Sequence, residues 1–86
     1  MKAQLEIGDK IQRFEVQLSK EIDFIYEIES VTKTLAKTKN GYIFKRDLDY
    51  NTTTPKKSTN KIIAEVHLKG ESGWCAPRYY LIQTTN

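Results

Sequence analysis

Basic and aromatic side chains are interleaved along the middle of the chain. Lysine and arginine neutralise phosphates, and exposed aromatic rings can stack on unpaired bases, so this mixture is typical of nucleic-acid contact. Because stacking needs unpaired bases, RNA is favoured over duplex DNA. The candidate nucleic-acid-binding residues are Lys33, Lys37, Lys39, Lys45, Arg46, Lys56, Lys57, Lys61, Tyr42 and Tyr50.

A purely structural interpretation accounts for the same pattern of basic and aromatic residues. Tyr42 and Phe44 can belong to the core, and the lysines can form a solvated face that also protects the edges of a sheet. Asp47 and Asp49 lower the positive charge locally. The sequence leaves this alternative open.

The densest cluster of large side chains lies near the C-terminus. Tryptophan, tyrosine and arginine are enriched at the energetic centres of protein interfaces. If exposed, the cluster predicts docking on a protein, such as a host protein, or self-association into a homo-oligomer. The alternative is that Trp74 closes one end of a small barrel. The candidate protein-interaction residues are Trp74, Arg78, Tyr79 and Tyr80.

Few residues are suited to catalysis. His67 is the only histidine and Cys75 the only cysteine, and no known spacing places a partner group against either. The sequence has neither a P-loop nor a glycine-rich dinucleotide turn. Two of the three carboxylates Asp47, Asp49 and Glu65 could form a catalytic pair. Acids close to Lys45 and Arg46, however, more often make surface ion pairs. We therefore expect no enzyme.

Metal binding is not expected either. One histidine, one cysteine and scattered acids do not reach a four-ligand site at any standard spacing. The sequence thus predicts no metal and no cofactor.

Length and charge indicate one small basic domain spanning residues 1–86. The chain has 14 basic and 11 acidic residues and a net charge of +3, which favours an anionic partner. A single cysteine suits a reducing cytoplasm. Neither a signal peptide nor an apolar stretch of about 20 residues is apparent, so no membrane partner is expected.

Several stretches have the composition of β-strands. Residues 10–18 alternate as a strand does, although a helix over 10–22 also fits the spacing. Residues 23–32 are rich in β-branched and aromatic side chains, with a bulge expected near Glu29-Ser30. Residues 51–60 form a polar loop, 62–68 fit either a strand or a short helix, and 79–83 read as a closing strand.

The surest element is a hairpin at Asn40-Gly41, since both residues tolerate positive φ. In a two-residue turn, Lys39 faces Tyr42, and lysines share a face with aromatic residues. In a three-residue loop, Thr38 faces Tyr42, and the lysines separate from the aromatic and small side chains. A one-residue slip exchanges the two faces, and we favour the three-residue loop because it leaves one face apolar.

Three segments resemble a pattern found in small phage-encoded SH3-like β-barrel proteins. They are Ile7-Gly8-Asp9-Lys10-Ile11, Tyr26 through Thr34, and Asn40 through Asp47, and the likeness covers residues 5–48. In those proteins an entry strand precedes a "VTKT" strand, which is followed by a turn and an "F-K-R" strand. The resemblance implies a five-stranded barrel without a catalytic site, encoded by a phage or prophage, that binds host proteins or nucleic acid. The Trp74-to-Tyr80 cluster lies outside the pattern.

Taken together, these observations predict a mostly-β fold, an SH3-like or OB-like barrel of about five antiparallel strands with room for one short helix. The expected function is a non-enzymatic nucleic-acid-binding regulator or inhibitor acting against a host system. The alternative is a protein-interaction module that docks through the C-terminal cluster.

Overall fold

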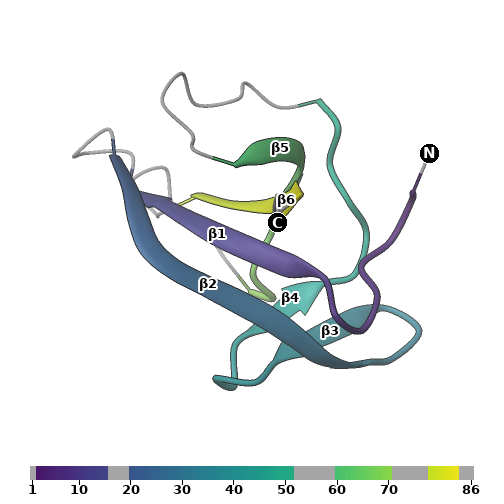
Figure 1. Cartoon of the computed structure of the whole chain (residues 1–86). Helices are drawn as coiled ribbons and strands as arrows, with labels where there is room; N and C mark the ends of the chain where they lie inside the picture. The colour runs from purple at the N-terminus through teal and green to yellow at the C-terminus, as the bar shows by residue number, and fades with distance from the viewer. Residues whose placement is uncertain (1, 16–19, 52–59, 71–77, 84–86) are drawn as a thin grey trace.

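A computed structural model describes residues 2–15, 20–51, 60–70 and 78–83. All regular secondary structure in these residues consists of six antiparallel strands. The side chains of residues 15 and 20–24 are not part of this description. Figure 1 shows the strands as one curled sheet. The strands are β1 (Lys10–Glu15), β2 (Lys20–Val31), β3 (Leu35–Thr38), β4 (Ile43–Lys45), β5 (Lys61–Val66) and β6 (Arg78–Gln83).

The sheet has the strand order β4-β3-β2-β1-β6-β5 and curls until its two edges meet. β2 is long enough to pair with β1 along its first part and with β3 along its last part (Figure 1). The chain beyond β5 reaches β4, where Lys45 N donates to His67 O at 2.7 Å and Lys69 N donates to Ile43 O at 3.0 Å. A second bridge joins Asp49 to Glu65.

The core lies inside this curl and receives alternate residues of β3, β4 and the second half of β5, whereas β6 buries four consecutive residues. Ile11, Ile28 and Phe44 are fully buried, and Tyr79 packs edge-on against Phe44 with ring centroids 5.1 Å apart. The alternation in β3, β4 and β5 is the period-two burial expected when one face of a sheet is covered. The buried cluster consists of Leu5, Ile11, Tyr26, Ile28, Ala36, Phe44, Val66, Tyr79 and Leu81.

The central hairpin has the three-residue loop. Thr38 N donates to Tyr42 O at 2.9 Å, so Lys39, Asn40 and Gly41 form the loop, and Gly41 has the positive φ of 94° that this geometry requires. The register pairs Ala36 with Phe44. The favoured register is therefore confirmed, and the two-residue turn is wrong.

The mostly-β class predicted from sequence is confirmed, with six strands rather than about five. β1 is a strand rather than the rival helix, β5 settles the ambiguity over residues 62–68, and β6 is the expected closing strand. The β2–β3 register shifts between Ile28 and Ser30, which is the bulge expected there. Residues 16–18 of the first predicted strand, and 52–59 of the predicted loop, lie outside the described residues.

Candidate nucleic-acid interface

The outward side of the β3–β4 hairpin carries alternating lysines and aliphatic side chains. Register pairs Lys37 with Ile43 and Leu35 with Lys45, and we call these four residues the outer face. Both lysines and Ile43 are exposed, whereas Ala36, Thr38 and Phe44 point inward and are buried. The lysines and the core side chains thus occupy opposite sides of the same two strands.

The outer face continues beyond β4. Leu68 packs against the core and forms a bridge with Phe44, so alternation turns its neighbours His67 and Lys69 outward. Backbone bonds set Lys69 beside Ile43. A third exposed lysine therefore joins Lys37 and Lys45 on one side of the sheet, and we call these three the outer lysines.

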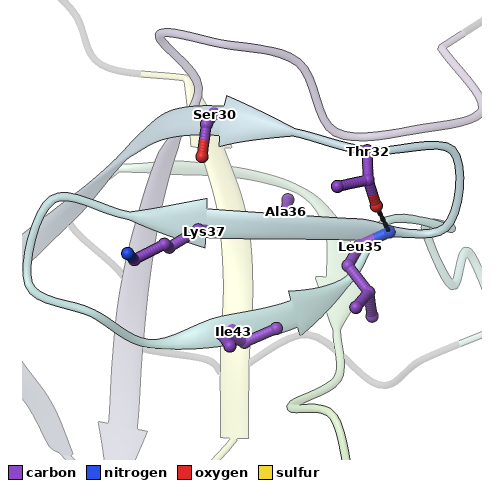
Figure 2. Close-up of a pocket in the computed structure, with 6 residues that line it drawn as sticks. All are labelled: Ser30, Thr32, Leu35, Ala36, Lys37 and Ile43. Carbon is purple, nitrogen blue, oxygen red and sulfur yellow. Dashed lines mark hydrogen bonds between the residues drawn. The ribbon is translucent and has the colours of Figure 1, made fainter.

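A hollow of about 170 Å³ opens on this side of the sheet. Figure 2 shows its lining side chains spread over the end of β2, β3 and β4, with Lys37 at one end and Leu35 at the other. The Thr32 hydroxyl oxygen accepts a hydrogen bond from Leu35 N at 3.1 Å. The lining residues are Ser30, Thr32, Leu35, Ala36, Lys37 and Ile43. A mainly apolar depression beside three cations can hold an amphipathic anion.

The lysines of this protein fall into two groups. Lys2 pairs with Asp9 at 2.7 Å, and Lys10 and Lys39 both pair with Glu27, the latter at 2.9 Å. Hydrogen bonds from these two ammonium groups lower the pKa of Glu27 to about 2. No carboxylate partner within the described residues reaches the outer lysines, Lys33 or Lys61. Their positive charge is therefore available to an external anion.

Lys39 and Arg46, two predicted phosphate-binding residues, are engaged in the fold. Arg46 donates to Leu5 O at 2.8 Å and to Thr32 O at 2.9 Å, which ties the N-terminal segment to the β2–β3 loop. Lys39 neutralises Glu27. Both cations thus have partners inside the fold, and their contact with nucleic acid stays a prediction.

The two tyrosines that were predicted to stack on bases also make contacts within the fold. Tyr42 is 36% exposed, and its ring lies edge-on to Tyr26 with centroids 4.9 Å apart. The Tyr50 hydroxyl donates to the Lys2 carbonyl. Neither tyrosine is among the residues that line the hollow, so the outer face relies on aliphatic rather than aromatic contacts.

The remaining predicted site residues differ in how exposed they are. Lys33 is exposed in the β2–β3 loop and Lys61 at the start of β5. Arg78 is exposed, but Tyr79 and Tyr80 are only 3% and 2% exposed. Both rings are therefore largely inaccessible in this structure, and docking through the C-terminal cluster stays a prediction. Lys56, Lys57 and Trp74 lie outside the described residues.

A second polar group was missed as a unit in the sequence. His67 Nε2 lies 3.0 Å from Asp49 Oδ2, and His67 Nδ1 lies 4.0 Å from Glu65 Oε2. The hydrogen bond from His67, followed by one from Asn51 N, lowers the pKa of Asp49. The spacing of Glu65 and His67, two residues apart at the end of β5, was the available signal. Asp49 joins them only through the bridge that closes the sheet.

Among the residues that the structure describes, no helix is long and apolar enough to cross a membrane. Comparison of the chain with protein-family models, with curated proteins and with solved structures finds no match.

Proposed function

We propose that this chain is a non-enzymatic module that binds single-stranded nucleic acid, with RNA favoured, through the outer face of β3 and β4. One observation carries the proposal: the outer lysines have no carboxylate partner among the described residues, and they lie on the side of the sheet where an apolar hollow opens, with Lys37 in its lining. Phosphates and bases require this combination of charge and apolar surface in one place.

The division of labour follows from the chemistry of each side chain. Lys37, Lys45 and Lys69 neutralise successive phosphates and release counterions, which supplies affinity without sequence preference. Leu35 and Ile43 contact a base or sugar placed in the hollow. A duplex hides its base faces and cannot make this contact, so single strands are the preferred ligand.

The hollow itself does not separate RNA from single-stranded DNA, because its exposed surface is almost entirely apolar although Ser30 and Thr32 are among its lining residues. RNA stays favoured over duplex DNA because only unpaired bases can enter the hollow.

A domain that occupies RNA without cleaving it acts by blocking or by recruiting. We therefore assign the chain a regulatory or inhibitory role in the cytoplasm, with a phage–host contest as the setting that the motif resemblance suggests. The alternative of docking on a protein through the C-terminal cluster has less support, since Tyr79 and Tyr80 are buried.

A salt titration tests the proposal directly. Fluorescence anisotropy with a labelled 12-nucleotide oligouridine is expected to show binding that weakens with salt, with a slope of about −2 in log K against log[salt] for three contacts. The double variant Lys37→Glu, Lys45→Glu is expected to lose about 1.4 of that slope and at least about tenfold in affinity.

The matched control compares two single lysine-to-glutamate substitutions, which change the net charge by the same amount. Lys61→Glu changes the net charge as much as Lys45→Glu does, but Lys61 lies at the end of β5 remote from the segment that meets β4. Lys45→Glu is expected to weaken binding several times more than Lys61→Glu does. Equal losses would show that only net charge matters, and absence of binding at low salt would refute the proposal.

A further inference from the structure

We propose that Asp49, Glu65 and His67 form a binding site for a transition-metal dication of the Zn²⁺ type, which would clamp the closure of the sheet. Their ligand atoms, one from each side chain, all lie within 4.8 Å of one another. His67 lies next to Lys45 on the outer side of the sheet, but none of the three residues is assigned to the nucleic-acid contact, and zinc binding is measured without nucleic acid, so each proposal can fail without the other.

The backbone holds the three residues in place. Asp49 N donates to Glu65 O at 2.9 Å, and Glu65 N donates to Asp49 O at 2.8 Å, which fixes the two chains in antiparallel register. His67 is two residues beyond Glu65 and is anchored by its own carbonyl, which accepts from Lys45 N at 2.7 Å. Side chains of alternate residues and of a bridged partner therefore converge on one side of the sheet.

The distances suit a shared ion. Two neighbouring ligands with bonds of about 2.1 Å and angles of about 90–110° lie about 3.0–3.4 Å apart. Asp49 Oδ2 and His67 Nε2 are 3.0 Å apart, so an ion can replace the proton they share. Glu65 Oε2 lies 4.0 Å from the other ring nitrogen, and one ligand atom from each of the three side chains lies within 4.8 Å of the others, so binding one ion requires only a modest approach of the three side chains.

The donor set selects the kind of ion. One imidazole nitrogen with two carboxylate oxygens suits zinc and its first-row neighbours, whereas calcium and magnesium prefer oxygen alone. The carboxylates of Asp49 and Glu65 supply the negative charge that balances a dication. Three protein ligands leave coordination positions for water, so the site resembles an open rather than a closed one.

Calorimetric titration of the tag-free protein with ZnCl₂ tests this site. A Cys75→Ser background removes the only thiol of the chain. We expect a one-to-one heat signal and a rise in melting temperature with Zn²⁺, because the ion binds the folded state in preference to the unfolded one. His67→Gln and Asp49→Asn are each expected to raise the Kd at least about tenfold.

Asp47→Asn is the matched control, since Asp47 is a neighbouring aspartate that bonds Gln4 and not the cluster. It should leave Zn²⁺ binding unchanged. Circular dichroism establishes that each variant folds, and Asp49→Asn decides the question if His67→Gln does not fold. Absence of binding at millimolar Zn²⁺, survival of binding in both cluster variants, or its loss in Cys75→Ser alone would overturn the proposal.

Discussion

The two faces of the β3–β4 hairpin share a backbone but are chemically opposite. The inner face buries Ala36, Thr38 and Phe44, whereas the outer face exposes Lys37, Ile43 and Lys45. The inner side chains pack into the core that holds the sheet in its curl. The outer side chains contribute little to that packing. The comparison separates residues kept for the fold from residues left available for a partner.

A similar division applies to the lysines. Lys2, Lys10 and Lys39 neutralise acids of the same chain, while the outer lysines have no such partner among the residues described. A net charge of +3 cannot reveal this difference, because it counts both groups alike. Position relative to the carboxylates, rather than the number of lysines, indicates where an anion binds.

Truncation of the inner face should have the largest effect. Phe44→Ala removes a fully buried ring that packs on Tyr79 and is expected to lower the free energy of unfolding by about 3–5 kcal/mol. Ile43→Ala, one residue away and 39% exposed, should cost about 1 kcal/mol or less. Urea denaturation measures both, and equal losses would contradict the division between the faces.

The loop that sets the register comes next. Gly41 has φ of 94°, and nothing lies within 4 Å of a Cβ added there, so Gly41→Ala introduces backbone strain without a clash. We expect a loss of about 1–2 kcal/mol in thermal or urea unfolding. Gly41→Asn should lose less, because asparagine tolerates positive φ better. A neutral Gly41→Ala would argue against the three-residue loop.

The smallest effect concerns the paired lysines. The pKa of Glu27 is about 2 in the folded protein against an ordinary value of 4.5, so folding favours its charged form. Its contribution to stability is therefore present above about pH 4.5 and is lost as the pH falls toward 2. Glu27→Gln should flatten this part of the pH profile of the melting temperature.

Glu29→Gln, at an exposed position two residues along β2, is the control for that profile. Its pH dependence should follow that of the unmodified protein. A profile for Glu27→Gln that matches the unmodified protein would show that the pairs with Lys10 and Lys39 do not form in solution.

Much of the fold could be predicted because local patterns were sufficient. Asn40-Gly41 marked the turn, alternation marked β1, the run of large apolar residues at 79–82 marked β6, and the break in alternation near Glu29 marked the bulge. The hairpin register followed from requiring one apolar face. The outer position of Lys37 and Lys45 is a direct consequence of that register.

Long-range contacts explain what could not be predicted. Nothing near Arg46 in sequence indicates that it binds Leu5 O, and the bridge that brings Asp49 to Glu65 depends on the curl of the whole sheet. Tyrosine is a residue type typical of protein interfaces, but Tyr79 and Tyr80 are buried within this fold. Composition cannot distinguish these two uses of an aromatic ring.

The central claim is that the outer face, and no other aliphatic surface, meets the nucleic acid. The most direct test is a methyl-resolved NMR titration of the protein with oligouridine. The account predicts progressive shifts of the Ile43 and Leu35 methyl signals, with the buried Ile28 and the exposed Ile63 unchanged. Static Ile43 and Leu35 signals beside shifts at Ile63, or at the exposed Ile7, would contradict it.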